Sequence, residues 1–260
     1  MNIIAVIPAR MGSSRFPGKP MAKILGMPMI GHCYKRAELC ELLDYVYVAT
    51  CDQEIYNYIK SIEGNVVMTS DKHERACDRA AEAMIKIEEI HNIKTDILLM
   101  MQGDEPMVTP RIIESAIQPL LKYNDINISN LYREIKSVKE FEDPNEVKVI
   151  IDKMGNAIYF SREPIPSRKK GFSKVPMYKQ ICTIPFKRNY LLEFNKMNQT
   201  NLEIIESIDM NRIIENGGRI KMEYAEDESI SVDTIDDLNR VITEMQNDIL
   251  IKYYLNNEKE

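Results

Sequence analysis

Short apolar runs alternate with amphipathic stretches through the first half of the chain. The runs are rich in β-branched and other large apolar residues, which is typical of buried strands, and they lie at residues 3–7, 45–49, 66–68 and 97–101. The stretches between them repeat apolar residues at helical spacing and lie at residues 29–43, 53–62, 78–91 and 110–123. This alternation predicts an α/β fold with a mostly parallel sheet.

The pattern changes after about residue 127. Further strands are predicted at residues 126–132, 147–151, 157–160, 181–186, 219–224 and 230–232. Further helices are predicted at residues 190–195, 202–216 and 234–254. No repeat or low-complexity linker divides the chain, so we expect one domain over residues 1–260 with an inserted β element at about 127–187, rather than two independent domains.

Charge and composition restrict the class of partner. The chain has 260 residues and a formal net charge of −6, which argues against nucleic acid or an anionic membrane as the main partner. No apolar run approaches the roughly 20 residues that span a bilayer, so we expect a cytoplasmic protein that acts on small molecules. Its five cysteines include no C-x-x-C pair, so neither a disulfide framework nor a zinc site is indicated.

The most informative segment directly follows the first predicted strand. Between Pro8 and Pro20 it contains three cations, two glycines and two hydroxyls, namely Arg10, Arg15, Lys19, Gly12, Gly18, Ser13 and Ser14. A loop of this kind at the end of a buried strand can surround a polyanion with backbone N–H groups and fixed positive charge. It matches neither G-x-G-x-x-G nor G-x-x-x-x-G-K-[ST]. The segment predicts a phosphate-binding loop, and the alternative is a basic surface loop.

Two aspartates follow predicted strands. Asp104 comes after the strand at 97–101 through Gly103, and Asp233 comes after the strand at 230–232. Open α/β sheets bind ligands at the carboxyl ends of their strands, and Mg²⁺ takes one or two protein carboxylates together with substrate phosphate oxygens. The pair predicts a site for a metal-bound triphosphate. The alternatives are turn formation by Asp104 and helix capping by Asp233, with Thr234 as a competing cap.

These motifs carry a resemblance to a known family. The segments that match it are Ile7–Arg10 and Ser13–Pro20, then Pro28–Ile30, Val48–Thr50, Gln102–Met107, Asp143–Lys148, Tyr159–Arg162 and Val232–Leu238. In these segments and in their order the chain resembles the 3-deoxy-manno-octulosonate (Kdo) cytidylyltransferases, within the sugar nucleotidyltransferases. The resemblance implies a Rossmann-like nucleotidyltransferase sheet, CTP and an acidic sugar as substrates, Mg²⁺ as cofactor, release of pyrophosphate and a homodimer.

The resemblance also implies roles for individual residues. The catalytic residues would be Arg15, Lys19, Asp104 and Asp233, with Asp104 and Asp233 holding the metal. The nucleotide would be bound by Pro8, Ala9, Arg10, Gly12, Ser13, Ser14, Arg15, Lys19, Arg75 and Gln102. The acceptor would be bound by Gln102, Arg162, Gln180, Thr183, Glu206 and Asp209. Arg162 would meet the sugar carboxylate, for which a guanidinium is the geometric match. Glu206 and Asp209 could instead be a solvated pair on a helix face.

Two segments depart from the family pattern. At residues 75–77 the family has Ser-Gly-Thr, whereas this chain has Arg75, Ala76 and Cys77. The change places the cation of Arg75 beside the base or ribose, and the alternative is that the Arg75 side chain points to solvent. Where the family has His-Leu-Gly-Ile-Tyr-Gly-Tyr, this chain reads Gln180–Phe186, so the acceptor could be another acid or a phosphorylated small molecule.

Two other functions remain open. One is a glycosyltransferase that uses a ready-made sugar nucleotide, and the other is a non-catalytic CTP-binding subunit.

Overall fold

The computed structural model describes residues 1–12, 16–169 and 175–255. Contacts between Cα atoms divide the chain into two compact units. Unit 1 consists of Met1–Glu114 and Asp227–Glu260, and unit 2 consists of Ser115–Glu226. Unit 1 is therefore discontinuous in sequence, whereas unit 2 is one continuous stretch. The inserted element expected at 127–187 lies within unit 2, and its own boundaries stay a prediction.

Unit 1 contains a parallel sheet and the helices that cover it. Its strands are β1 (Ile3–Ala9), β2 (Lys23–Ile24), β3 (Met27–Pro28), β4 (Tyr45–Thr50), β5 (Val66–Met68) and β6 (Ile97–Met100). Its helices are α1 (Met29–Glu38), α2 (Gln53–Ser61), α3 (Ala76–His91) and α9 (Ile235–Met245), with 3₁₀ turns η1 (Lys19–Met21) and η2 (Ile251–Tyr253). Helix α4 (Pro110–Lys122) crosses the boundary between the units.

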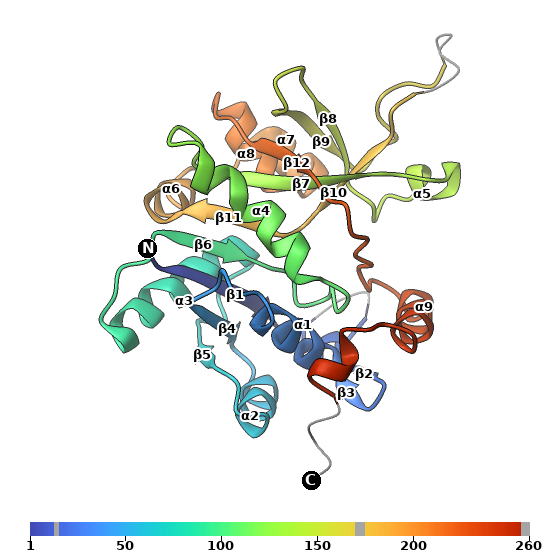
Figure 1. The fold of residues 1–260 in the computed structure, drawn as a ribbon. Helices are drawn as coiled ribbons and strands as arrows, with labels where there is room; N and C mark the ends of the chain where they lie inside the picture. The colour runs from blue at the N-terminus through green and yellow to red at the C-terminus, as the bar shows by residue number, and fades with distance from the viewer. Residues whose placement is uncertain (13–15, 170–174, 256–260) are drawn as a thin grey trace. The chain divides into compact units, whose positions relative to one another are not determined.

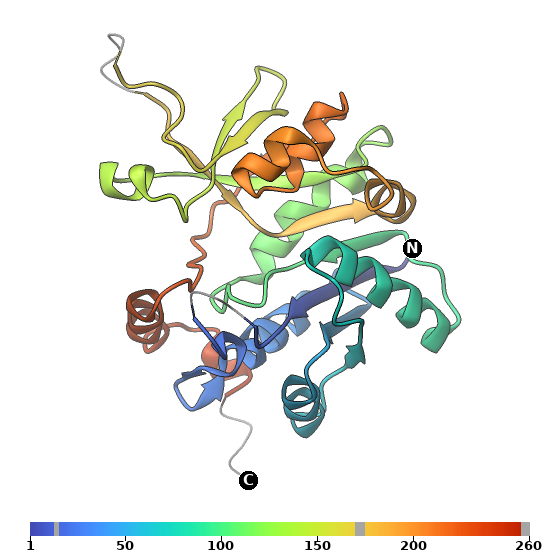
Figure 2. The same ribbon diagram turned by 180° about the vertical axis from the view of Figure 1, so that it is seen from behind.

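The parallel sheet confirms the predicted α/β fold. The strand order runs β6-β1-β4-β5, with Ile4 opposite Tyr45 and Val6 opposite Met100. Helix α1 lies in front of these strands in Figure 1, and α3 lies in front of them when they are seen from behind in Figure 2. Because both faces are covered, β1 is buried along nearly its whole length, as its continuous apolar run predicted.

Unit 2 contains a mixed sheet with helices and a short hairpin. Its strands are β7 (Ser129–Glu134), β8 (Lys148–Ile151), β9 (Ala157–Ser161), β10 (Tyr178–Ile181), β11 (Ile184–Lys187) and β12 (Lys221–Tyr224). Its helices are α5 (Val138–Glu142), α6 (Arg188–Phe194), α7 (Asn201–Glu206) and α8 (Met210–Glu215). The strand order is β12-β7-β10-β8-β9, in which β12 and β7 are parallel and the other pairs antiparallel.

Four predicted elements differ from the structure. The strand expected at 181–186 is broken at Cys182 and Thr183 into β10 and β11. The helix expected at 202–216 is two helices, because Ser207 adopts a left-handed backbone with φ of 53° and ends α7. Residues 230–232 are not a strand, and the helix expected at 234–254 ends at Met245 before the short turn η2.

A buried polar network ties the chain around η2 to α1 within unit 1. His32 contacts the Ile24 carbonyl through Nε2 (2.8 Å) and the Tyr254 hydroxyl through Nδ1 (2.9 Å). Arg36, which is 0% exposed, donates to the same hydroxyl and to Asp248. Desolvation by burial lowers the pKa of His32 to about 4, so the ring is neutral at pH 7.

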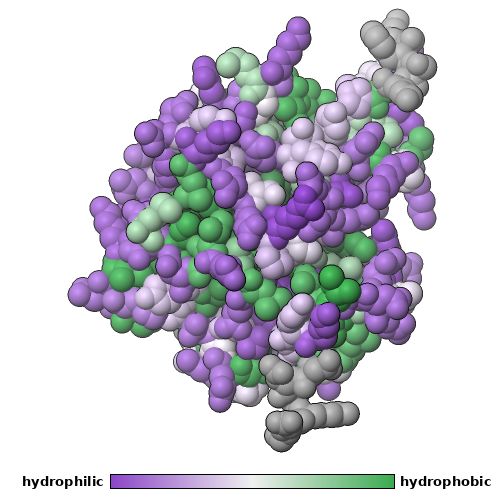
Figure 3. Space-filling view, viewed as in Figure 1, coloured by the Kyte–Doolittle hydropathy of each residue, from purple (hydrophilic) through white to green (hydrophobic). Residues whose placement is uncertain are grey.

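Hydrophilic side chains cover most of the face of the molecule in Figure 3. Among the described residues, no helix is both long enough and apolar enough to cross a membrane.

Candidate nucleotide and metal site

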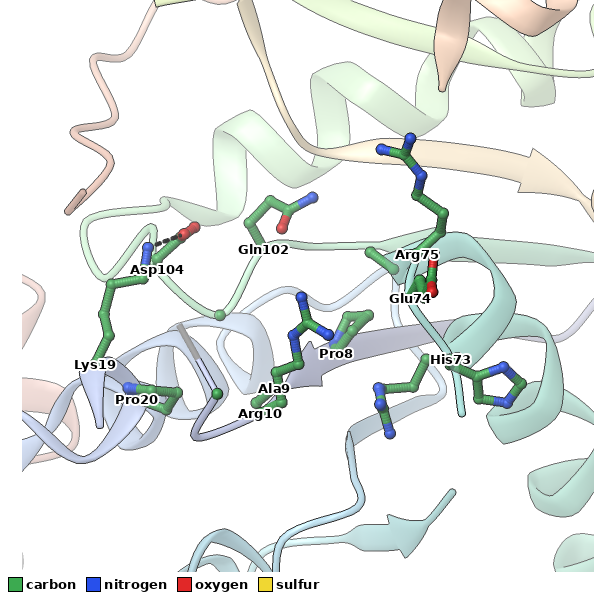
Figure 4. Close-up of a pocket in the computed structure, with 14 residues that line it drawn as sticks. Pro8, Ala9, Arg10, Lys19, Pro20, His73, Glu74, Arg75, Gln102 and Asp104 are labelled. Atoms are coloured by element: carbon green, nitrogen blue, oxygen red, sulfur yellow. Dashed lines mark hydrogen bonds and ion pairs between the residues drawn. The ribbon is translucent and has the colours of Figure 1, made fainter. Parts of the chain in front are cut away.

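A cavity of about 320 Å³ opens in unit 1 at the carboxyl ends of β1 and β6 (Figure 4). It is lined by Pro8, Ala9, Arg10, Gly12, Lys19, Pro20, His73, Glu74, Arg75, Ala76, Arg79, Gln102, Gly103 and Asp104. This set includes every described residue that the sequence placed at the nucleotide. Ser13, Ser14 and Arg15 lie outside the described residues, so their predicted roles stay predictions.

The loop after β1 is held at both of its described ends. The Met11 amide donates to Asp52, which follows β4, over 2.8 Å. The Gly18 amide donates to the Met11 carbonyl over 3.1 Å. Gly18 itself has a φ of +72°, a backbone conformation that side chains with a Cβ rarely adopt. These contacts return the chain to the sheet edge and place Lys19 at the cavity.

Lys19 brings the two predicted metal ligands together. Its Nζ lies 2.5 Å from an Asp104 carboxylate oxygen and 3.4 Å from an Asp233 carboxylate oxygen, and Figure 4 shows the first of these contacts. The three side chains are 12%, 26% and 17% exposed, so the charges interact in a partly buried setting. Two carboxylates 129 positions apart in sequence therefore converge on one cation.

Asp104 owes its place to the glycine before it and to the strand beside it. A Cβ added at Gly103 would lie 3.1 Å from the Pro8 carbonyl oxygen, so a larger residue would push the chain away from β1. The Asp104 carbonyl accepts a hydrogen bond from the Val232 amide over 2.9 Å. This hydrogen bond positions Asp233 at the site, although residues 230–232 do not form the strand that the sequence predicted.

Thr234, rather than Asp233, caps helix α9. The Thr234 hydroxyl accepts from the Asp237 amide, and the Asp237 carboxylate accepts from the Thr234 amide, which is a capping box. The capping alternative for Asp233 is therefore wrong, since its carboxylate instead contacts Lys19.

The two carboxylates fit a magnesium site. Mg²⁺ usually binds one or two protein carboxylates and completes its shell with phosphate oxygens and water. Within the described residues, no group of three or more His, Cys, Asp or Glu side chains forms a metal cage. Asp104 and Asp233 are thus suited to a metal that arrives with a polyphosphate, and Lys19 occupies the position between them.

Arg79 is a pocket residue that sequence reasoning missed. It projects from the first turns of α3 and is 3% exposed, with one guanidinium nitrogen 2.5 Å from the Thr69 hydroxyl. Its other terminal nitrogen, Nη2, is buried without a hydrogen-bond partner in the described structure. A buried charged donor without a partner is costly, so it indicates a ligand acceptor. The available signal was an arginine directly before the apolar pair Ala80 and Ala81 of an otherwise buried helix face.

The segment before α3 forms the second wall of the cavity. His73, Glu74 and Arg75 come from it, and Figure 4 shows the side chains of Arg75 and Gln102 on the same side of the pocket. Arg75 is only partly exposed and lines the cavity, so the structure does not favour a purely solvent-directed side chain.

The residues predicted to bind the acceptor, other than Gln102, lie in unit 2. Glu206, 9% exposed, accepts hydrogen bonds from the Tyr159 hydroxyl (2.8 Å), the Ser161 hydroxyl (2.7 Å) and the Arg162 amide (2.8 Å). Although burial raises the pKa of Glu206, these hydrogen bonds outweigh it and lower that pKa below its usual value. Arg162 in turn donates to the carbonyls of Glu206 and Pro144. Arg162 and Glu206 therefore contact each other.

The other three acceptor candidates lie on other elements of unit 2. Asp209 is not on α7 with Glu206 but directly precedes α8, so the helix face expected to carry both does not exist. Gln180 lies within β10 and Thr183 lies in the break before β11, and both side chains are buried.

Comparisons with known proteins agree on one family. A family described as cytidylyltransferase matches residues 4–230. The 3-deoxy-manno-octulosonate cytidylyltransferase of Geobacter metallireducens is 38% identical over 255 residues, which covers 94% of this chain and 98% of that protein. The enzyme of the same name from Thermodesulfovibrio yellowstonii is 42% identical over 245 residues, covering 92% of this chain and 96% of that protein.

Solved structures give the same result. The structure of CMP:2-keto-3-deoxy-manno-octonic acid synthetase complexed with CTP has a TM-score of 0.85 and 33% identity, and the match covers 95% of this chain and 99% of that one. A glucose-1-phosphate thymidylyltransferase from Bacillus anthracis, described as putative, has a TM-score of 0.67 at 13% identity and covers 95% and 96%. The second likeness shows the fold alone.

Proposed function

Because the chain belongs to the cytidylyltransferase family, we propose that it transfers the cytidylyl group of CTP to the anomeric hydroxyl of 3-deoxy-manno-octulosonate and releases pyrophosphate. The observation that carries the proposal is the convergence of Lys19, Asp104 and Asp233 at the rim of a cation-lined pocket. That arrangement suits a triphosphate, whose charge must be neutralised for pyrophosphate to leave.

The reaction is an in-line displacement. The sugar hydroxyl attacks the α-phosphorus, the bond to the β-phosphate oxygen breaks, and pyrophosphate departs. Arg10 and Lys19 lie where they can neutralise charge on the phosphates, and Arg79 can donate to an acceptor atom on the nucleotide. Gln102, which follows the carboxyl end of β6 and lines the cavity, can hydrogen-bond the nucleotide or the sugar. The protein contributes position and fixed charge.

We propose Mg²⁺ as the cofactor, held by Asp104 and Asp233. When bound, it would neutralise the phosphate oxygens and orient them for attack. Lys19 would leave the carboxylates and donate its hydrogen bonds to the phosphates. Arg15, Ser13 and Ser14 remain predicted phosphate contacts.

A different acidic acceptor is the second candidate. It is favoured by the segment from Gln180 to Phe186, which departs from the family pattern and which contains the break between β10 and β11. A pocket that lacks the family's histidine and tyrosine would leave unpaired the polar groups of the acceptor that those two side chains bond.

The deciding experiment measures pyrophosphate release with Mg²⁺ while the four ribonucleoside triphosphates are crossed against Kdo and a panel of other acids. Release with CTP and Kdo supports the proposal. Release with CTP and another acid alone replaces Kdo with that acceptor. CTP binding without any release identifies a non-catalytic subunit, and release only from a sugar nucleotide identifies a glycosyltransferase.

We also propose a cytoplasmic homodimer. CTP is a cytoplasmic metabolite, and the resemblance implies pairing through the β element of unit 2. Ile158 on β9 is an exposed apolar side chain that is available for such a contact. Light scattering of the purified protein tests the assembly, and replacing Ile158 with Lys is expected to yield monomers.

A further inference from the structure

The segment between β5 and α3, residues 69–75, carries part of the pocket. Its Thr69 amide donates to the Thr50 carbonyl, and the Thr69 hydroxyl contacts Arg79. The part of the segment nearer the cavity, His73 to Arg75, has an anchor on helix α3. Arg75 stands at the N-cap of α3 and makes no side-chain cap, so capping does not fix the start of this helix.

Glu82 supplies that anchor from the second turn of α3. Its Oε2 accepts a hydrogen bond from the Ser70 amide over 3.0 Å and contacts Nε2 of His73. An ionised carboxylate only accepts, so the His73 nitrogen is the donor. One carboxylate oxygen therefore binds the segment at two points three residues apart. Figure 4 shows the His73 ring on the α3 side of the pocket, away from Arg10 and Gln102.

The other oxygen of Glu82 has a different partner. Lys86 lies one turn further along α3, and its Nζ is 2.7 Å from Oε1 of Glu82 and 2.7 Å from the Met68 carbonyl. Burial raises the pKa of Glu82, but hydrogen bonds from Lys86, the Ser70 amide and His73 lower it to about 2. The side chain is thus a carboxylate at any physiological pH, and the charge that holds the segment is permanent.

We propose that Glu82 is a positioning residue for nucleotide binding, which fixes the 69–75 segment through Ser70 and His73 so that Arg75 and Arg79 face the pocket. Glu82 itself does not line the cavity. The inference rests on the proposed function for the identity of the nucleotide, whereas the anchoring of the segment does not depend on it.

The first experiment compares steady-state kinetics of Glu82→Gln with the parent protein. The amide keeps the shape but loses the charge that strengthens two hydrogen bonds, so the KM for CTP is expected to rise about tenfold with kcat within about twofold. Glu89→Gln, an exposed glutamate on the same helix, is the matched control and should change neither constant. Lys86→Met should also leave the KM unchanged, because the segment is held by the other oxygen.

A second experiment reads the segment directly by amide hydrogen exchange without nucleotide. Glu82→Gln should speed exchange at residues 70–76 at least several-fold, and Glu89→Gln should not. His73→Asn, which removes one of the two anchored groups, should give a smaller rise in both exchange and KM. It also serves if Glu82→Gln fails to fold.

Three results would overturn the inference: a Glu82→Gln protein with the parent's KM and exchange, a loss confined to kcat, or an equal rise of KM in Lys86→Met. Absence of pyrophosphate release by the parent protein with every triphosphate would instead overturn the proposed function. In that case the exchange measurement still decides whether Glu82 holds the segment.

Discussion

The candidate nucleotide pocket of unit 1 and the acceptor candidates of unit 2 use charged side chains in opposite ways. In the pocket, Arg79 has a buried nitrogen without a partner in the described structure, and Lys19 joins two aspartates at the cavity rim. In unit 2, Glu206 accepts three hydrogen bonds from its neighbours, and Arg162 donates to two carbonyls. The first set has hydrogen-bonding capacity for a ligand, while much of the capacity of the second is used within the fold.

A charged residue of a motif can therefore contact the ligand itself, or it can hold the fold around the site. A side chain whose donors face a cavity gains its partners when the ligand binds. A side chain whose donors already have protein partners contributes to stability, and its loss is felt in folding as well as in binding. Substitutions that separate activity from stability can therefore test the comparison.

The largest expected effect is at the aspartates. Asp104→Asn and Asp233→Asn should each reduce kcat about 10³-fold, since each removes a negative charge that would hold the Mg²⁺ bound to the phosphates. Thermal stability should change little, because both carboxylates lie at the cavity rim. Pyrophosphate release and a melting curve measure the two quantities, with the exposed Asp71→Asn as control. A large fall in melting temperature with normal kcat would reverse the assignment.

Arg79→Met should have the next largest effect. Removing a buried guanidinium with an unpartnered nitrogen should cost little stability, while CTP affinity should fall about 10- to 100-fold. Calorimetric titration with CTP, together with a melting curve, gives both values. If the protein unfolds and the folded fraction binds CTP normally, Arg79 belongs with the residues that hold the fold.

Glu206→Gln should show the opposite pattern. It weakens three hydrogen bonds inside unit 2, so unfolding free energy should fall by about 1–3 kcal/mol and the melting temperature by several degrees. The KM for CTP should not change. An unchanged melting temperature with a raised KM for the acceptor would show that the carboxylate serves the sugar rather than the fold.

The smallest expected effect is the pH dependence of stability from His32, which lies outside both regions. Burial lowers the pKa of His32 in the folded protein to about 4, from the 6.5 of an imidazole in water, so the unfolded chain binds the proton more readily. Its contribution is complete above pH 6.5 and declines as pH falls toward about 4, by less than about 1 kcal/mol at pH 6. Denaturant titration at several pH values should show this slope, and His32→Gln should remove it without altering CTP affinity at pH 7.5.

Much of unit 1 could be predicted because its signals are local. A run of apolar residues such as β1 must be buried, and the cations and glycines after it mark the loop. Asp104 and Asp233 were expected together, and the structure brings them together at Lys19. The way in which Asp233 is positioned was not predictable, because the Val232 amide that bonds the Asp104 carbonyl belongs to a segment that is not a strand.

Unit 2 was harder to predict for physical reasons. Ser207 ends α7 with a left-handed backbone although it is not glycine, so apolar spacing alone continued the helix to residue 216. In unit 1, Arg79 was missed because an arginine before the apolar pair Ala80 and Ala81 marks a buried helix face, whereas the role of its guanidinium follows only from tertiary partners. The contact of Glu82 with Ser70 and His73 likewise joins a helix to the loop before it, which no periodicity records.

The network around Arg36 has a consequence for synthesis on the ribosome. When residue 226 has emerged, all of unit 2 is present, but Arg36 and His32 still lack Asp248 and Tyr254. Unit 2 can therefore fold first, although unit 1 begins the chain. Until the later residues arrive, His32 of the nascent α1 has the Ile24 carbonyl and Arg36 has the Val108 carbonyl, but neither has its partner from the chain around η2, so the network is completed only after unit 2 has emerged.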